Sequence, residues 1–430
     1  IVLSNPFCIL RTIGDGEVRA PKYFEAEELS SIYSPYHFPA ENREFKARNV
    51  VIFVTESISA ENSAYLCPEI YQDKEQKGYT PFLDSLMQNG YAFRRMYAAG
   101  KRSIQALPSV WGSMPSLVTP FVLMPQSLGE SRPLPMLLKE RGYSTAFFCG
   151  SERGSMGFDA YALSAGFDRC LSKEDYEKVH GHNDFDGYWG IWDDKFLSFM
   201  GEQIDTLAEP FIASVFTISS HHPFVLPDQW RERLPQGESL IQPCAAYLDA
   251  SIERFFAENS DKEWFDNTVF VFVADHVSSE HYAEQTTVSP GDFHILGAIY
   301  TPNGELKGET FEPVSQIDIM PTLLGILGYD APYFAYGRDV FAPCEEPVTI
   351  VYDNGAYKAF SEEYIYIFTD DAIREIYSIT DTARTANLIS THNNLSIERR
   401  IKAYIQQYYE HAERKSYIVP DSVSSGNSLR

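Results

Sequence analysis

Short, wholly apolar runs alternate along the central part of the chain with segments whose apolar residues recur at helical spacing. The runs NVVIFVT at 49–55 and TVFVFVA at 268–274 are typical of strands buried on both faces of a sheet. The segment TPFLDSLMQNG at 80–90 has helical spacing and ends at a glycine, which favours a helix stop. The same criteria predict further helices at 132–142, 193–209, 248–260 and 315–328, and further strands at 143–150, 210–222 and 293–302. This alternation predicts an α/β fold, a largely parallel sheet sandwiched by helices.

The pattern changes near both ends of the chain, which predicts three parts. Residues 1–48 are irregular, and we expect an arm that packs on the main domain, or a linker after a missing membrane anchor. Residues 49–345 form the expected catalytic domain. In residues 346–430, short β-rich runs separated by turn signals predict a small antiparallel β-meander, followed by an amphipathic helix.

Composition narrows the possible partners. The chain has 430 residues, and its hydrophobic content of 44% supports a sizeable core. Its formal net charge of −25 argues against nucleic acid as a partner. No apolar run approaches the length of about 18 residues that spans a bilayer, but the chain begins with Ile1, so an upstream anchor is compatible with it. The six cysteines have no CxxC spacing, so we expect neither a zinc knuckle nor a redox motif.

Charged residues directly follow two predicted strands. Glu56 ends the run VIFVTE, and Asp275 and His276 end the run VFVFVADH. Because ligands bind beyond the carboxyl ends of parallel strands, we expect these side chains to meet at one sheet edge. Two carboxylates and an imidazole suit one divalent metal ion, Mn²⁺, Mg²⁺ or Zn²⁺, and the sequence does not choose among them. The alternatives are a solvated strand end, a helix cap and a surface histidine.

Ser103 stands between the cations Lys101 and Arg102 and an apolar segment expected to be helical. Two cations and the free amides of a helix start suit an anion, so we expect Lys101 and Arg102 to bind a substrate phosphate. A divalent cation beside Ser103 would lower the pKa of its hydroxyl and make it a nucleophile. Alternatively, Ser103 only caps the helix.

Three histidines complete the candidate site. His221 and His222 end the strand predicted at 210–222, where either could contact a substrate or protonate a leaving group. His294 opens the strand predicted at 293–302 and is a weaker candidate for substrate binding. For all three, an ordinary loop histidine is the alternative.

Several motifs occur in an order similar to that of a known family, namely NVVIFVTES, YTPFLDSL, AGKRS, TISSHHPF, VADH and SQIDIMPTLLGILG. The chain resembles the lipoteichoic acid synthase and phosphoglycerol transferase group of the alkaline phosphatase–sulfatase superfamily. The resemblance implies that Glu56, Asp275 and His276 bind a metal together with Ser103. It also implies that Ser103 is the nucleophile and that His221 contacts the substrate.

Some positions depart from that group. Ser103 stands where threonine is usual, which keeps the hydroxyl. The stretch GFDAY, with Phe158 and Asp159, stands where lipoteichoic acid synthases carry a Trp-Asn-Arg run for glycerol phosphate. The Cys/Ser-x-Pro-x-Arg signature of formylglycine sulfatases is absent, because SIQAL begins at Ser103. The head group therefore stays open.

The resulting expectation is a metal-dependent phosphotransferase. It would move a phosphoglycerol- or phosphoethanolamine-type head group from a phospholipid to an envelope glycan or lipid acceptor, through a covalent Ser103 intermediate. One alternative is a phosphodiesterase- or sulfatase-type hydrolase, and another is a non-catalytic sensor or binding domain with the same fold. The resemblance further implies a bacterial membrane protein, anchored by N-terminal helices outside this sequence, whose catalytic domain faces the periplasm or exterior.

Overall fold

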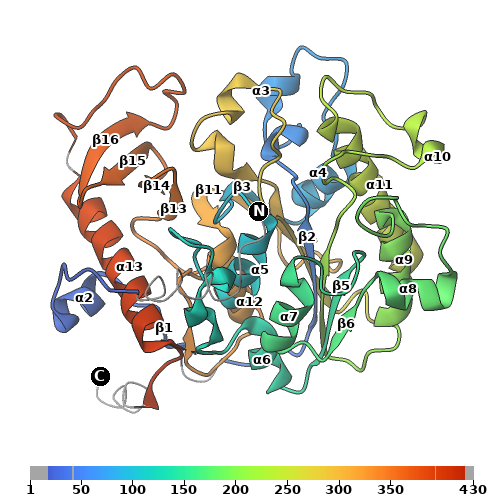
Figure 1. Cartoon of the computed structure of the whole chain (residues 1–430), viewed down its shortest axis with the longest axis horizontal. Coiled ribbons are helices and arrows are strands. Elements are labelled where there is room, and N and C mark those ends of the chain that lie inside the picture. The colour runs from blue at the N-terminus through green and yellow to red at the C-terminus, as the bar shows by residue number, and fades with distance from the viewer. Residues whose placement is uncertain (1–17, 41–42, 393, 422–430) are drawn as a thin grey trace, which may run out of the picture.

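A nine-stranded sheet lies between layers of helices, and a smaller lobe packs on one side (Figure 1). The computed structural model describes residues 18–40, 43–392 and 394–421. Eight strands lie in the order β11-β3-β10-β8-β2-β7-β5-β6, and β9 pairs with β3. In chain order they are β2 (Asn49–Thr55), β3 (Tyr91–Tyr97), β5 (Ser144–Cys149), β6 (Arg169–Leu171), β7 (Phe211–Phe216), β8 (Thr268–Ala274), β9 (His294–Ile295), β10 (Gly297–Tyr300) and β11 (Gly308–Ser315).

Strand β2 lies at the centre of the sheet and is parallel to both of its neighbours. Val51 lies opposite Ala213 of β7 and Phe270 of β8. Every residue of β2, β7 and β8 is buried, as their continuous apolar runs predict. Strand β10 is antiparallel to β3 and to β8, so the sheet is mixed but mostly parallel. The predicted fold class is confirmed.

Helices cover both faces of this sheet. Residues opposite each other in paired strands share a face, and successive residues alternate. Phe53 packs against Phe255 of α11 with ring centroids 5.3 Å apart. Ser214, which lies opposite Ile52, accepts a hydrogen bond from the Trp111 indole of α5 at 3.1 Å. Helices α5 and α11 therefore cover opposite faces.

The other helices group around these two. Helices α4 (Pro81–Asn89) and α9 (Asp193–Ile204) pack on α11 (Ile241–Asn259), while α6 (Leu134–Lys139) and α12 (Ile319–Ile326) pack on α5 (Ser103–Gly112). The larger lobe also contains helices α3 (Pro68–Tyr71), α7 (Phe158–Ser164), α8 (Lys173–His180) and α10 (Asp228–Arg231).

The smaller lobe is the predicted meander and terminal helix. Strands β13 (Thr349–Asp353), β14 (Ala356–Phe360), β15 (Tyr364–Thr369) and β16 (Ala372–Ser378) pair antiparallel in chain order. Helix α13 (Leu395–Arg414) shares one apolar core with this sheet, in which Ile401 and Tyr404 join Ile350 and Tyr366. Of the tail at 420–430, residues 422–430 lie outside the described part.

The described part of the N-terminal arm contacts both lobes. It holds α2 (Ala26–Ile32) and β1 (Tyr36–His37), and β1 pairs with β12 (Tyr333–Phe334) of the larger lobe. The backbone amides of Tyr23 and Phe24 donate to the side chain of Gln406 in α13. The short strands β17 (Ser416–Tyr417) and β4 (Glu130–Ser131) pair with each other and also join the lobes. Among the described residues, no helix has both the length and the apolarity needed to cross a bilayer.

Candidate metal and nucleophile site

Three adjacent strands direct their carboxyl ends to the same edge of the sheet. Strand β2 leads to Glu56, strand β8 to Asp275 and His276, and strand β7 to the loop that carries His221. Helix α5 begins at Ser103, next to the same edge. Residues more than 200 positions apart in the sequence thus meet at the edge where parallel sheets bind ligands.

Glu56, Asp275 and His276 form a compact cluster. Each offers one ligand atom, and these atoms all lie within 4.8 Å of one another. Ser103 Oγ lies 3.2 Å from Glu56 Oε2 and 3.2 Å from His276 Nε2. The four side chains are therefore close enough to contact one small ion.

A network of hydrogen bonds fixes the two carboxylates. The Ser57 hydroxyl donates to Glu56 Oε1 at 2.6 Å, and the backbone amide of Ser57 donates to Asp275 Oδ1 at 2.7 Å. The amide of His276 also donates to Asp275 Oδ1. Behind them, Ser220 Oγ donates to the carbonyl of Glu56, so the end of β7 supports the end of β2.

The donor set fits a divalent cation. Asp275 Oδ2 is buried, has no hydrogen-bond partner among the described residues and lies 3.3 Å from His276 Nε2. The His276 ring donates through Nδ1 to the carbonyl of Val277 at 2.7 Å, which leaves the Nε2 lone pair facing the cluster. Burial, together with the nearby charge of Asp275, raises the pKa of Glu56 well above its usual value. Carboxylate oxygens and an imidazole nitrogen thus converge on one small space, and Glu56, Asp275 and His276 would hold the ion.

A cavity of about 340 Å³ opens in front of this cluster, and we call it the Glu56 cavity. It is lined by Glu56, Ser57, Lys101, His221, His222, Phe224, His276, Val277, Ser278, Ser279, His281, Thr287 and Asp292. Lys101 Nζ lies 2.7 Å from Asp292 and 3.2 Å from Asp353 of β13, so the smaller lobe contacts a residue of the cavity wall.

His221 and His222 are exposed and line this cavity. His221 donates through Nδ1 to the carbonyl of His222 at 2.6 Å, which leaves Nε2 free for a substrate oxygen. The indole of Trp189 lies against the His221 ring, with centroids 4.6 Å apart. These contacts orient the His221 ring at the cavity.

Two residues expected to bind substrate lie elsewhere. Arg102 is exposed and does not line the cavity. His294 Nε2 donates to the carbonyl of Arg94, and its ring packs on Tyr97, because β9 pairs with β3 at this point. Burial lowers the pKa of His294 to about 4. The backbone pairing therefore gives His294 a structural environment.

Three polar residues near the site were not expected. Ser57 follows the end of β2 with a φ of 58°, an uncommon value outside glycine that points its amide at Asp275. His281 lines the cavity, with Nδ1 3.4 Å from buried Glu61. Asp292 pairs with Lys101. Ser57 could have been noticed because it directly follows Glu56, but nothing in the sequence marks the others.

Curated relatives match over most of this chain. Lipoteichoic acid synthase-like YvgJ of Bacillus subtilis is 24% identical over 349 residues, which cover 75% of this chain and 54% of the relative. Lipoteichoic acid synthase 1 of the same species is 25% identical over 366 residues, covering 78% and 55%. The chain thus spans about half the length of the curated relatives it matches.

Solved structures show the same fold. A protein of the alkaline phosphatase superfamily from Vibrio parahaemolyticus superposes with a TM-score of 0.76 at 24% identity, covering 89% of this chain and 91% of that one. Lipoteichoic acid synthase LtaP from Listeria monocytogenes superposes with a TM-score of 0.73 at 19% identity, covering 92% and 100%.

The family profile described as Sulfatase matches residues 48–329, more than half of the chain. This range contains β2 with Glu56, the start of α5 with Ser103, and the end of β8 with Asp275 and His276. The family resemblance of the sequence is confirmed: the chain belongs to the sulfatase family.

Proposed function

We propose that this chain is a phosphotransferase that moves a phosphoglycerol- or phosphoethanolamine-type head group from a phospholipid to an envelope acceptor. The observation that carries the proposal is the contact of Ser103 Oγ with both Glu56 and His276, beside the unpartnered Oδ2 of Asp275. A hydroxyl in this setting is suited to attack phosphorus. The relatives named as lipoteichoic acid synthases support transfer as the reaction.

A divalent cation held by Glu56, Asp275 and His276 would lower the pKa of the Ser103 hydroxyl and offset negative charge on the phosphoryl oxygens. Ser103 loses its proton to solvent, and its Oγ forms a bond to phosphorus. The bond from phosphorus to the oxygen of the diacylglycerol part of the lipid breaks. His221 gives the leaving oxygen a proton through its free Nε2, so diacylglycerol departs.

In the second step, Ser103 is the leaving group and His221 accepts a proton. The acceptor hydroxyl gives its proton to His221 and attacks phosphorus, the bond to Ser103 Oγ breaks, and Ser103 Oγ takes a proton back from solvent. Lys101 at the cavity wall balances charge on the phosphate, although Asp292 and Asp353 share its ammonium group. Water in place of the acceptor would give hydrolysis on the same residues, so acceptor use separates a transferase from a hydrolase.

A single assay tests the proposal. Purified protein is incubated with phosphatidylglycerol or phosphatidylethanolamine, with a divalent metal and with or without a glycolipid acceptor. Diacylglycerol release and the mass of the acceptor are measured, and intact-protein mass spectrometry looks for a head-group adduct on Ser103. Acceptor modification that disappears in Ser103→Ala supports transfer. Lipid turnover that Ser103→Ala leaves at the parent rate would remove Ser103 from the mechanism.

The proposed setting is the outer side of a bacterial membrane, with the anchor upstream of residue 1. The relatives, about twice as long as the matched region, support this proposal, because their remaining length leaves room for such an anchor. In its own cells, the protein should fractionate with membranes and be cleaved by protease added from outside.

A further inference from the structure

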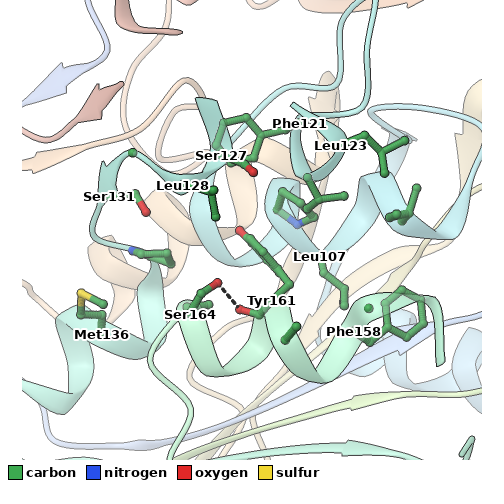
Figure 2. Close-up of a pocket in the computed structure, with 18 of the residues that line it drawn as sticks. Leu107, Phe121, Leu123, Ser127, Leu128, Ser131, Met136, Phe158, Tyr161 and Ser164 are labelled. Atoms are coloured by element: carbon green, nitrogen blue, oxygen red, sulfur yellow. Dashed lines mark hydrogen bonds between the residues drawn. The ribbon is translucent and has the colours of Figure 1, made fainter. Parts of the chain in front are cut away.

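A second cavity, larger and mostly apolar, lies next to the proposed site. Its volume is about 760 Å³, within the usual range of small-molecule pockets. Figure 2 shows Phe158 and Tyr161 of α7, Leu107 of α5, and Phe121 of the following loop around one space. We call it the Leu107 cavity. None of its lining residues belongs to the Glu56 cavity, so it is a distinct site.

Its mouth carries exposed apolar side chains. Leu128 is 90% exposed, Leu123 58% and Met156 42%, and all three line the cavity. Large apolar side chains gathered at the mouth of an apolar hollow mark a surface that binds hydrocarbon or another apolar partner. Figure 2 shows Leu123 and Leu128 on the segment above α7.

Two connections join this cavity to the proposed chemistry. Leu107 lies four positions after Ser103 in α5, so the two residues share a helix face about one turn, or roughly 5.4 Å, apart. On the other side, Met156 follows Ser155, whose hydroxyl accepts a hydrogen bond from the Trp189 indole at 2.9 Å. Trp189 in turn packs on His221.

We propose that the Leu107 cavity holds the hydrocarbon chain of the lipid whose head group reacts at Ser103. This inference rests on the proposed function, in which the leaving group is diacylglycerol. Such a substrate needs an apolar site beside a polar one, separated by about the length of a glycerol ester. The Glu56 cavity supplies the polar site, and the Leu107 cavity, lined by a residue one helical turn after Ser103, supplies the apolar site.

The first test measures binding without turnover. The probe is a lysophospholipid with a brominated acyl chain, used below its micelle concentration. Trp111 stacks on Tyr161, which lines the cavity, with ring centroids 6.0 Å apart, so a bromine in the cavity should quench its fluorescence. We expect saturable quenching that glycerol 3-phosphate, which lacks an acyl chain, does not reverse.

The cavity is filled by the double variant Ala160→Phe, Ser164→Phe. Both residues are exposed on α7 and line the cavity, so the added rings enter it without replacing a core side chain. Leu163→Phe is the matched control, because Leu163 lies on the same helix, is 57% exposed and does not line the cavity. Quenching should fall at least tenfold in apparent affinity in the filled variant and persist in the control.

The second test measures enzymatic activity on two substrates. The filled variant should lose at least tenfold in kcat/KM for a long-chain phospholipid while it turns over a soluble phosphodiester at the parent rate. A second variant, Leu123→Glu with Leu128→Glu, changes only exposed residues and should have the same effect if the filled variant does not fold. Val179→Glu, exposed on α8, controls for the added charge.

The outcomes are distinct. Quenching that survives both cavity variants, or equal loss of both substrates in them, overturns the lipid site. A parent protein that binds the brominated lipid in this cavity but releases no head group from any lipid supports the site and refutes the proposed function.

Discussion

The side-chain amide of Gln316 donates to the carbonyl oxygens of Ala274 and Asp275, at 2.7 Å each. Its Oε1 accepts the backbone amide of Ala99, in the loop that leads to Ser103. Gln316 is fully buried, so a single side chain ties the end of β8 to the approach to α5. The position of Ser103 relative to Asp275 depends on this link.

Replacing Gln316 by alanine should loosen the site. The change leaves two carbonyls and one amide without partners, and each unsatisfied buried group costs about 1–3 kcal/mol. We expect a lower free energy of unfolding in urea and weaker metal binding. Gln316→Glu, which keeps an acceptor for Ala99 but aims a carboxylate at two carbonyls, should be at least as destabilising. Wild-type stability in both variants would contradict the role of this link.

Ser103→Ala should abolish turnover without unfolding the protein. Removing a nucleophile typically lowers kcat by roughly 10³-fold or more. The change deletes one hydroxyl at the first residue of α5, so thermal unfolding should shift little. Ser103→Thr keeps the hydroxyl and should retain activity well above that of alanine. Equal activity of the alanine and threonine variants would argue that the hydroxyl plays no part.

Asp275→Asn should change stability in opposite directions with and without metal. In metal-free protein, the substitution removes one of two adjacent buried carboxylates, so we expect unchanged or higher thermal stability. In the presence of Mn²⁺, Mg²⁺ or Zn²⁺, the substitution removes a charged ligand. Metal affinity should fall by more than about 100-fold, which exceeds the usual loss when a residue that only supports a metal ligand is mutated. Calorimetry and metal analysis measure both effects.

Asp292→Asn is the control for the metal prediction. Asp292 lines the same cavity and pairs with Lys101, but it is not part of the three-residue cluster. This variant should bind metal like the parent. If it loses metal as Asp275→Asn does, the ion lies elsewhere in the cavity.

The buried His411 should make the protein sensitive to acid. Burial lowers its pKa from 6.5 to about 4, and its Nδ1 donates to the carbonyl of Ser416. Between these two pH values the unfolded chain binds more protons than the folded one. The stability that neutral His411 provides is therefore present above pH 6.5 and is lost as the pH falls to about 4, an effect of about 3 kcal/mol.

His411→Gln should flatten this dependence. Glutamine keeps a donor for Ser416 but does not titrate, so the stability difference between pH 7 and pH 4 should shrink by about 3 kcal/mol. His294, whose pKa is also lowered to about 4, still contributes to the pH dependence of stability in this variant. Urea unfolding across this pH range is the measurement, and an unchanged slope would contradict the prediction.

Continuous apolar runs made the centre of the sheet predictable. Strands β2 and β8 are buried on both faces, so polar residues occur only at their ends and do not interrupt the apolar runs, and the charged residues after them stand out. Strand β3 was harder to recognise, because Arg94 and Arg95 interrupt it. Arg94 is accommodated by lying over the Tyr65 ring and pairing with Glu309, contacts that only the folded chain creates.

The environment of His294 and the left-handed conformation of Ser57 also depend on the folded chain, so the sequence does not predict them. His294 donates to Arg94 because β9 pairs with β3 in a given register, and register depends on distant segments. The amide of Ser57 points at Asp275 because of a left-handed turn that the residue type does not favour. Spacing along the sequence carries neither fact.

The ion pairs of Lys101 connect the two lobes. Asp353 of β13 contacts both Lys101 and Lys358, so the smaller lobe shares in the charge balance beside the Glu56 cavity. A chimera that takes its last 85 or so residues from a distant homologue would therefore also change the charge balance beside the Glu56 cavity. Where the transplanted sheet lacks an acidic residue at this position, Lys101 would carry a freer positive charge, and the hybrid should prefer a more strongly anionic ligand.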